Sequence, residues 1–219
     1  RWKRAKSVSI FSDSDSIEYS RTPTGAVVAS VPALANLDAK GRYTSAVQGS
    51  TISQKFSLII DADGQWRISE LDDSVLMVQT LFTSLYVRSP LYFLNTASSS
   101  FVPDVRWYPR SRALAMMSEA LISAPSEWLS KVAHSVFTST DGKTDLSVSI
   151  EGGVARVNLP AEAASLKQQD LGFLQAQFTK TFVGSGLVQD VHLLAGGAPL
   201  EIPSVPDVQA YPYATVPAL

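Results

Sequence analysis

One pair of adjacent glycines constrains the fold of this 219-residue chain more than any other feature. Gly152 and Gly153 suit the two-residue loop of a β-hairpin, because glycine accepts positive φ at both central positions. Counting outward from this loop places apolar residues opposite one another: Ile150 with Ala155, Val148 with Val157, and Leu146 with Leu159. The polar residues between them also pair, Ser149 with Arg156 and Ser147 with Asn158. A half-buried antiparallel pair requires this separation, and a one-residue slip would mix the two faces.

A helix is predicted to follow this hairpin. Ser165 and Gln168 have the spacing of a capping box, in which two side chains satisfy backbone N–H groups at a helix N-terminus. Gly184 has the position of a helix stop. Between these ends, apolar residues recur at helical spacing: Leu171, Leu174, Phe178 and Phe182. The hairpin and the helix together predict an α+β unit with an apolar face that is shielded from water. Neither element carries a recognisable set of catalytic or metal-binding residues.

The same helix carries a second apolar stripe. Leu166 and Phe173 lie about 140° around the helix from the first stripe, given ~100° per residue. A helix with one buried face should not carry both stripes. Two interpretations remain open: the second stripe docks on the N-terminal half of the chain, or it faces solvent and is available to a partner.

The N-terminal half is predicted to be rich in β-strands. Residues 7–10 and 17–19 alternate in polarity, and residues 25–31 are apolar and β-branched. A second hairpin forms over residues 56–68 if Ala62, Asp63 and Gly64 are its loop. Gly64 then supplies the left-handed position, Ile60 pairs with Trp66, and Leu58 pairs with Ile68. Residues 72–86 are predicted to be helical, with Leu76, Leu81 and Leu85 among the apolar positions.

The C-terminal half is predicted to begin with two strands, over residues 91–94 and 102–108. The spacer between them, residues 95–100, is typical of either a domain linker or a hairpin tip. A helix follows from about Arg112, with a second short helix capped by Ser126. Later elements are the hairpin, the long helix, a strand over residues 188–194 and a turn at Gly196 and Gly197.

These patterns predict two small α+β domains with mainly antiparallel or mixed sheets. We expect the first over residues 1–98 and the second over residues 99–203. Residues 204–219 are predicted to form a proline-rich tail, because proline disfavours both a helix interior and a central strand. We expect this tail to lead to a C-terminal domain missing from the chain.

Composition excludes several classes of function. No apolar run reaches ~18 residues, so no transmembrane helix is expected. The net charge of -2 argues against nucleic-acid binding. The absence of cysteine excludes disulfides, thiolate catalysis and cysteine-ligated metals. Residues 1–6 hold the main basic cluster, which suits a solvated end or a membrane-surface contact.

No set of residues predicts catalysis, a metal site or a cofactor. His192 can share a strand face with Asp190, but two ligands are too few for zinc, and His134 lies 58 positions away. Residues 61–64, Asp-Ala-Asp-Gly, resemble the opening of a calcium loop without its distal glutamate, so a hairpin turn is favoured. The acidic pairs at residues 13/15 and 72/73 are typical of solvated loops. We therefore expect a protein that is not an enzyme.

Three aromatic residues flank the first helix of the C-terminal half: Trp107, Tyr108 and Trp128. They either close the core or form a cluster that binds a partner, because Trp and Tyr are favoured anchors at interfaces.

Several stretches, in order over residues 60–203, carry a family resemblance. They are Gly-Gln-Trp-Arg-Ile at 64–68, Leu-Tyr-Phe-Leu at 91–94, Val-Pro-Asp at 102–104, Ala-Pro-Ser-Glu-Trp-Leu at 124–129, the hairpin at 151–159 and Pro-Leu-Glu-Ile at 199–202. The second half resembles a GerMN domain, and the whole chain resembles the actinobacterial lipoprotein LpqB family.

The resemblance implies an N-terminal α+β domain, a GerMN domain and a β-propeller after them. It implies a protein held by a lipid anchor, absent from this chain, on the extracytoplasmic face of the cell membrane. The implied partner is the extracellular domain of an MtrB-like sensor histidine kinase of the MtrA–MtrB type, in cell-envelope and cell-division homeostasis. It supplies no catalytic residues, cofactor or metal.

Three functions compete at this stage, and surface features distinguish them. A kinase-binding accessory protein predicts an apolar patch of several hundred Å² with no pocket. A module that binds peptidoglycan or another cell-wall polymer predicts a shallow aromatic groove. An enzyme acting on such a polymer predicts a deep polar cleft lined with carboxylates.

Overall fold

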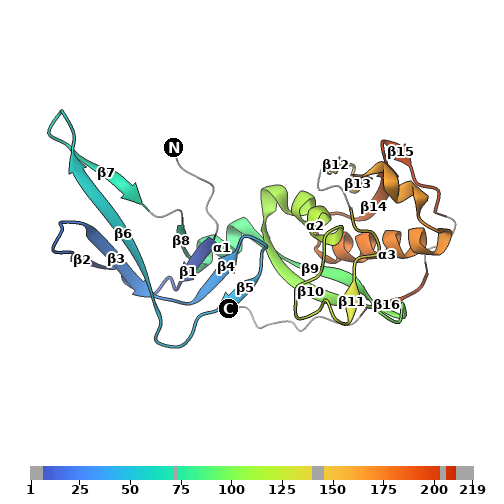
Figure 1. Cartoon of the computed structure of the whole chain (residues 1–219), viewed down its shortest axis with the longest axis horizontal. Helices are drawn as coiled ribbons and strands as arrows, with labels where there is room; N and C mark the ends of the chain where they lie inside the picture. Colours follow the sequence, from blue (N-terminus) through green and yellow to red (C-terminus); the bar gives the residue numbers. More distant parts are fainter. Residues whose placement is uncertain (1–6, 72–73, 140–145, 203–205, 211–219) are drawn as a thin grey trace. The chain divides into compact units, whose positions relative to one another are not determined.

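The computed structural model describes residues 7–71, 74–139, 146–202 and 206–210. The chain divides into two compact units, Arg1–Tyr86 and Val87–Leu219 (Figure 1). Each unit combines β-sheets with helix, so the predicted α+β class is confirmed.

The first unit contains a sheet of strand order β5-β4-β1-β8. Its strands are β1 (Ser7–Phe11), β4 (Ala35–Asp38), β5 (Tyr43–Ser45) and β8 (Val75–Val78). β1 pairs antiparallel with β4 and parallel with β8, so the sheet is mixed. Ile10, Leu37 and Met77 are buried, as is Phe82 of the helix α1 (Gln79–Leu85).

The helix predicted over residues 72–86 is only partly correct. Residues 75–78 form β8, because these apolar residues pair in parallel with β1. The helix α1 begins only at Gln79. Leu81 and Leu85, placed among its apolar positions, are 46% and 48% exposed. Phe82 is buried instead and stacks on Tyr86, with ring centroids 4.8 Å apart.

The second sheet of the first unit is antiparallel and has the order β2-β3-β6-β7. Its strands are β2 (Glu18–Arg21), β3 (Val27–Pro32), β6 (Thr51–Ile60) and β7 (Trp66–Leu71). The predicted pairs of this hairpin are confirmed: Leu58 with Ile68, and Ile60 with Trp66. Gly64 has a φ of 77°, as its left-handed position requires. The register shifts once, between Ser57 and Leu58.

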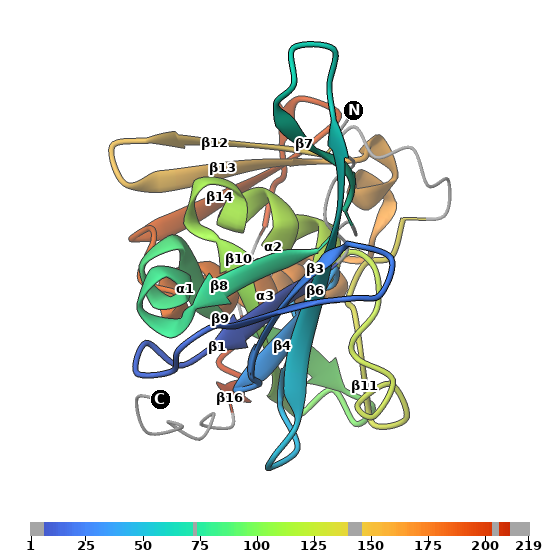
Figure 2. The same cartoon turned by 90° about the vertical axis from the view of Figure 1, so that its left-hand side faces the viewer.

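The second unit contains two further sheets. One has the order β11-β9-β10-β16, with β9 (Tyr86–Asn95), β10 (Ser100–Pro109), β11 (Ala133–His134) and β16 (Gln209–Ala210). The other has the order β12-β13-β14-β15, with β12 (Ser147–Glu151), β13 (Val154–Leu159), β14 (Asp190–Ala195) and β15 (Ala198–Pro199). Figure 2 shows β12, β13 and β14 side by side.

Two α-helices complete the second unit: α2 (Ala113–Leu121) and α3 (Gln168–Gly184). The 3₁₀ turns η1 (Arg110–Arg112) and η2 (Ala161–Ser165) precede them. The short helix predicted after Ser126 is instead a turn, in which Leu129 and Ser130 donate backbone N–H groups to the Ser126 carbonyl at 2.8 and 3.0 Å.

The β12–β13 hairpin has the register predicted from its sequence. Ser147 to Glu151 pair with Asn158 to Val154, and the two loop glycines have φ values of 58° and 81°. Ala155, Val157 and Leu159 of β13 are fully buried. β12 is the edge strand and is mostly exposed; its Ile150 is 59% exposed. The prediction of a buried apolar face therefore holds for β13 and fails at Ile150.

The capping box predicted for the long helix is wrong. Ser165 ends η2, and α3 begins at Gln168 with Lys167 as a cap that makes no side-chain hydrogen bond. Gly184 is the last helical residue, whereas Gly186 has the positive φ of 73°. The predicted apolar stripe is confirmed, because Leu171, Leu174, Phe178 and Phe182 are all buried.

The second stripe of α3 is buried within its own unit. Phe173 is 6% exposed and belongs to a small core cluster with Tyr92, Leu94, Phe101, Ala176 and Val208. Leu166 packs against the main core of the same unit. Neither interpretation of the second stripe is therefore correct, because residues of its own unit bury it. The stripe exists because β9 is buried on both faces: Leu91 and Phe93 join the main core, while Tyr92 and Leu94 meet Phe173.

The division between the two units differs from the expected boundary at residues 98 and 99. The compact units meet between Tyr86 and Val87, and residues 95–100 connect two strands of one sheet. Asn95 Oδ1 accepts the backbone N–H groups of Ser99 and Ser100 at 2.9 and 3.2 Å, which fixes a tight turn. These residues are therefore a hairpin tip.

The structure describes residues 206–210 of the segment expected as a tail. Its β16 pairs in parallel with the start of β10, Ser100 with Gln209 and Phe101 with Ala210. Val208 is 7% exposed and belongs to the same small cluster as Phe173. The described part of this segment therefore belongs to the second unit.

Candidate functional site

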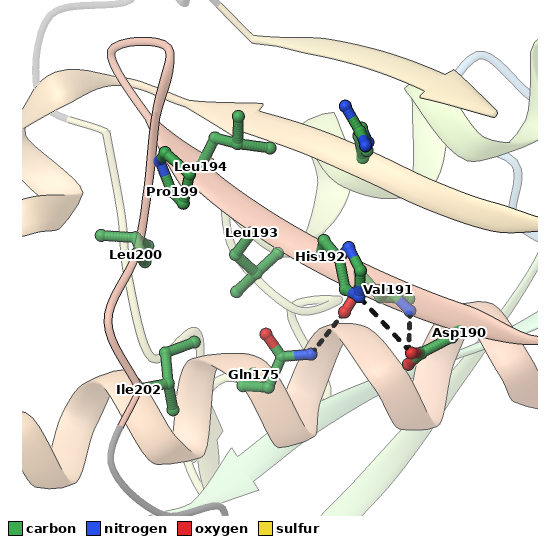
Figure 3. Close-up of a pocket in the computed structure, with 10 residues that line it drawn as sticks. Gln175, Asp190, Val191, His192, Leu193, Leu194, Pro199, Leu200 and Ile202 are labelled. Carbon is green, nitrogen blue, oxygen red and sulfur yellow. Dashed lines mark hydrogen bonds and ion pairs between the residues drawn. The ribbon is translucent and has the colours of Figure 1, made fainter. Parts of the chain in front are cut away.

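A groove of about 500 Å³ opens beside β14 in the second unit (Figure 3). Its polar lining residues are Arg156, Gln175, Asp190 and His192. Its apolar lining includes Leu194, Pro199, Leu200 and Ile202. The volume is within the range of ligand pockets, so its chemistry decides whether it is a binding site.

The groove exists because β14 lacks a neighbouring strand along part of one edge. β15 pairs only with Leu194 and Ala195. Further back along the strand, the Val191 carbonyl accepts a hydrogen bond from Gln175 Nε2 at 2.7 Å, and the Val191 N–H donates to Asp190 Oδ1 at 2.8 Å. Side chains thus occupy the backbone groups that an added strand would use, which protects this edge.

The predicted His192–Asp190 pair forms, and it is solvated. The distance from His192 Nε2 to Asp190 Oδ2 is 3.6 Å, and the two side chains are 61% and 55% exposed. His134 lies on β11, in the other sheet of this unit. Among the described residues, no group of three or more His, Asp or Glu side chains could hold a metal ion.

The groove matches neither of the two polymer-related expectations. Asp190 is the one carboxylate among its described lining residues, whereas an enzyme was expected to show a carboxylate-lined cleft. None of those lining residues is Trp, Tyr or Phe, the side chains that would form the expected aromatic groove.

The acidic residues singled out in the first unit have structural roles. Asp61 Oδ1 accepts the backbone N–H groups of Asp63 and Gln65 at 3.0 and 2.9 Å. Its Oδ2 lies 3.1 Å from Arg67 Nε, so Asp61 organises the hairpin turn, as favoured over a calcium loop. Asp13 Oδ2 accepts the backbone N–H of Thr80 at 3.0 Å, at the start of α1. Asp72 and Asp73, like the basic cluster at residues 1–6, lie outside the described residues.

Sequence reasoning missed a buried charge cluster on β10. Asp104 Oδ2 lies 2.8 Å from Arg106 Nη2 and accepts the Ser126 backbone N–H at 2.8 Å. Asp104 Oδ1 lies 3.0 Å from Ser126 Oγ, and Arg106 Nη2 donates to the Ala124 carbonyl at 3.3 Å. Polar residues at two-residue spacing in an otherwise apolar strand were the available signal. The cluster ties the turn after α2 to β10.

The three flanking aromatic residues do not form one cluster. Tyr108 is 2% exposed, and burial raises its pKa to about 12. Trp107 is half-buried, while Trp128 is 69% exposed on the turn after Ser126. The core interpretation is therefore confirmed for Tyr108 and wrong for Trp128.

The largest concentration of exposed apolar side chains lies on the second sheet of the first unit. Tyr19, Ile60, Trp66, Ile68 and Leu71 are 70%, 58%, 64%, 56% and 39% exposed. All five belong to β2, β6 or β7, whose strands form one sheet. This is the apolar surface that a protein-binding function predicts, and it is our candidate functional site.

In the described part of the chain, no helix is long and apolar enough to cross a membrane.

Two family models match the chain, one in each unit. The model for the lipoprotein LpqB N-terminal domain matches residues 1–83, and the model for the sporulation and spore germination domain matches residues 90–201. The junction between these matches agrees with the division of the structure between Tyr86 and Val87.

Curated relatives include several proteins named lipoprotein LpqB. The chain is 32% identical to the one from Nocardia farcinica over 77% of its own length, 27% identical to the one from Thermobifida fusca over 94%, and 30% identical to the one from Cutibacterium acnes over 95%. It spans only 29%, 34% and 35% of the length of these relatives.

Among solved structures, the chain is similar to the tandem GerMN domains of the sporulation protein GerM from Bacillus subtilis. The identity is 20% and the TM-score 0.44, over 58% of this chain and 45% of that one. The first GerMN domain of the same protein gives 21% and 0.42, over 58% of this chain and 94% of that one.

Proposed function

The chain belongs to the lipoprotein LpqB family, and from this premise we propose that it is the accessory module of a two-component system. In this proposal the whole protein is lipid-anchored on the extracytoplasmic face of the cell membrane. There the module binds the extracellular domain of an MtrB-like sensor histidine kinase and takes part in cell-envelope homeostasis. The partner is the one that the family resemblance implies.

The exposed apolar side chains of the β2-β3-β6-β7 sheet are the observation that carries this proposal. Exposed apolar surface of this extent marks an interaction site in a soluble domain. Trp and Tyr, both present here, are the residues most often found as binding anchors. A catalytic function would need convergent polar groups, and this surface offers large apolar side chains instead.

Binding alone can regulate a kinase if the module prefers one of its conformations. A ligand shifts a conformational equilibrium only by the difference between its affinities for the two states. Coupling free energies of ~1–3 kcal/mol are typical of such regulation, which corresponds to roughly 5–150-fold in the equilibrium. The proposal therefore requires differential affinity and no chemical step.

The alternative function, binding of a cell-wall polymer, has weaker support. The groove beside β14 is large enough for a ligand, but its described lining contains no Trp, Tyr or Phe. Trp128 is exposed in the second unit but is not among the residues that line this groove.

The test is an isothermal titration of the purified chain with the extracellular domain of the kinase, in which calorimetry measures the heat of binding. We expect saturable binding, and no heat from peptidoglycan fragments under the same conditions. Adding the chain to the membrane-reconstituted kinase should change its rate of autophosphorylation. Saturable binding of the wall fragments without binding of the kinase domain would favour the alternative function.

A further inference from the structure

The pairing registers of the β2-β3-β6-β7 sheet assign each side chain to one of two faces. Directly paired residues share a face, and residues two apart along a strand share it as well. Tyr19 pairs with Ala29 and Ala29 with Gln54. Two residues further along these strands, Val27 pairs with Phe56, and Phe56 pairs with Leu71. The same face of the hairpin holds Leu58, Ile60, Trp66 and Ile68.

This face, which we call the apolar face, consists almost entirely of apolar residues. Its members are Tyr19, Arg21, Val27, Ala29, Val31, Ile52, Gln54, Phe56, Leu58, Ile60, Trp66, Ile68 and Leu71. The opposite face is mainly polar and holds Glu18, Ser20, Ser30, Ser53, Lys55, Ser57, Arg67 and Glu70, together with Val28 and Ile59. A sheet with this division is built to be covered on one side.

On the strands β3, β6 and β7, the exposed fraction of the side chains on the apolar face rises toward the hairpin loop. Ala29, Val31 and Gln54, near one end of β3 and β6, are 5%, 1% and 8% exposed. At the loop end, Ile60 and Trp66 are 58% and 64% exposed. The pairing of β6 with β3 ends at Val27 and Phe56, and beyond that point β6 is paired with β7 as far as Ile60 and Trp66 (teal in Figure 1). The exposed part of the apolar face is therefore a continuation of a buried surface.

The exposed area is appropriate for a reversible protein partner. Tyr19 is separated from the hairpin by the buried Ala29 and Gln54, so the contiguous exposed part consists of Ile60, Trp66, Ile68 and Leu71. These four side chains present apolar surface on the order of a few hundred Å², the size of patch that marks an interaction site. A complex formed on this surface would bury less than about 1,200 Å² in total, which is the range of weak and transient complexes. Permanent dimers bury roughly 2,000–5,000 Å², so this area favours a transient partner over an obligate second copy.

Charge further defines the chemistry of the partner. Among the described residues of the apolar face, Arg21 on β2 is the one charged side chain, and it lies away from the hairpin loop. The charges of the hairpin, such as Arg67 and Glu70, lie on the opposite face. The matching surface is therefore uncharged and apolar, and association with it depends little on ionic strength.

We infer that the exposed part of the apolar face, centred on Trp66 and Ile68, is the surface on which the kinase sensor domain docks through an uncharged apolar patch of its own. This inference rests on the function proposed above and adds the surface and its chemistry to it. Trp66 is the anchor, because large aromatic side chains at the centre of an interface contribute most to affinity.

The test uses two isoleucines on the same hairpin that differ in the face they occupy. Ile68 is 56% exposed on the apolar face, and Ile59 is 53% exposed on the opposite face. We expect Ile68→Ser to weaken binding of the sensor domain at least about tenfold, and Trp66→Ala about thirtyfold, as for hot-spot residues. Ile59→Ser, the matched control, should change the dissociation constant less than about twofold.

Two further measurements complete the experiment. The dissociation constant of the wild-type chain should change less than about threefold between low and high salt, because no charge lies at the centre of the face. Sedimentation of the wild-type chain and of Ile68→Ser should show monomers at the concentrations of the titration.

The outcomes separate this inference from the proposed function. If the wild-type chain does not bind the sensor domain, the proposed function fails, and the inference fails with it. If the wild-type chain binds and Ile68→Ser binds equally well, the function stands and the docking surface is wrong. A wild-type dimer that Ile68→Ser dissociates would identify a second copy as the occupant and overturn the inference.

Discussion

The two units differ in how completely they bury the apolar side chains of their strands. In the second unit, β9 buries side chains on both faces, and α3 contributes to both core clusters that result. In the first unit, the β2-β3-β6-β7 sheet buries one end of its apolar face and exposes the other. Similar alternating strands therefore give a closed core in one unit and an open surface in the other.

The largest expected effect is in the closed core. Phe178 of α3 is fully buried. Phe178→Ala should therefore lower the free energy of unfolding by ~3–5 kcal/mol through lost contacts and a residual cavity. Chemical denaturation measures the change, and hydrogen exchange locates it in the second unit. A loss below about 1 kcal/mol would mean that this core is less closed than the comparison requires.

A comparable loss is expected at the buried charge cluster. Asp104→Asn leaves the Arg106 guanidinium buried without its counter-charge. Breaking such a pair costs ~3–5 kcal/mol. Asp190→Asn is the control, because its partner His192 is exposed, and exposed pairs contribute only about 0–1 kcal/mol. Equal melting temperatures for the two variants would contradict the structural role of the cluster.

The hairpin turn of the second unit should give an intermediate effect. Gly153 has a φ of 81°. Because a β-branched residue is strained in that conformation, Gly153→Val should destabilise the chain by ~1–2 kcal/mol or more. Gly184→Ala is a matched control at a helical glycine, where alanine is favoured by ~0.5–1 kcal/mol. A thermal melt unchanged by Gly153→Val would show that the turn tolerates a side chain.

The smallest effect is expected on the open surface, despite the size of the residue. Trp66 is 64% exposed. An exposed substitution usually changes stability by no more than ~0.5 kcal/mol, so Trp66→Ala should melt like the wild-type chain. A loss above about 2 kcal/mol would reveal that this side chain is covered, and the contrast between the units would disappear.

The sequence predicted strand pairing more reliably than coverage. The registers of both hairpins followed from loop chemistry and from the two-residue period of a strand, and both are confirmed. The same period shows which residues share a face, but it contains no information on whether another layer covers that face. Ile150 and Ile68 were both assigned to apolar faces, and both are exposed.

Other errors arose where local and distant interactions compete. The apolar residues from Val75 to Val78 suited a helical pattern, but they form a strand because β1, far earlier in the chain, offers a parallel partner. Ser165 and Gln168 had the spacing of a capping box, yet a 3₁₀ turn ends at Ser165. The apolar surface of the candidate site could not be recognised from local sequence for the same reason: its exposure depends on what the rest of the chain leaves uncovered.

The register shift in the β6–β7 hairpin has a consequence for self-assembly. β7 is an edge strand, and Ser69 is the extra residue that its partner β6 does not match. The Ser69 hydroxyl donates to the Ser57 carbonyl at 3.1 Å, which holds this irregularity in place. An irregular edge is a poor template for strand-by-strand growth into fibrils. The chain can therefore expose an apolar sheet face, while the irregular edge strand β7 disfavours strand-by-strand polymerisation.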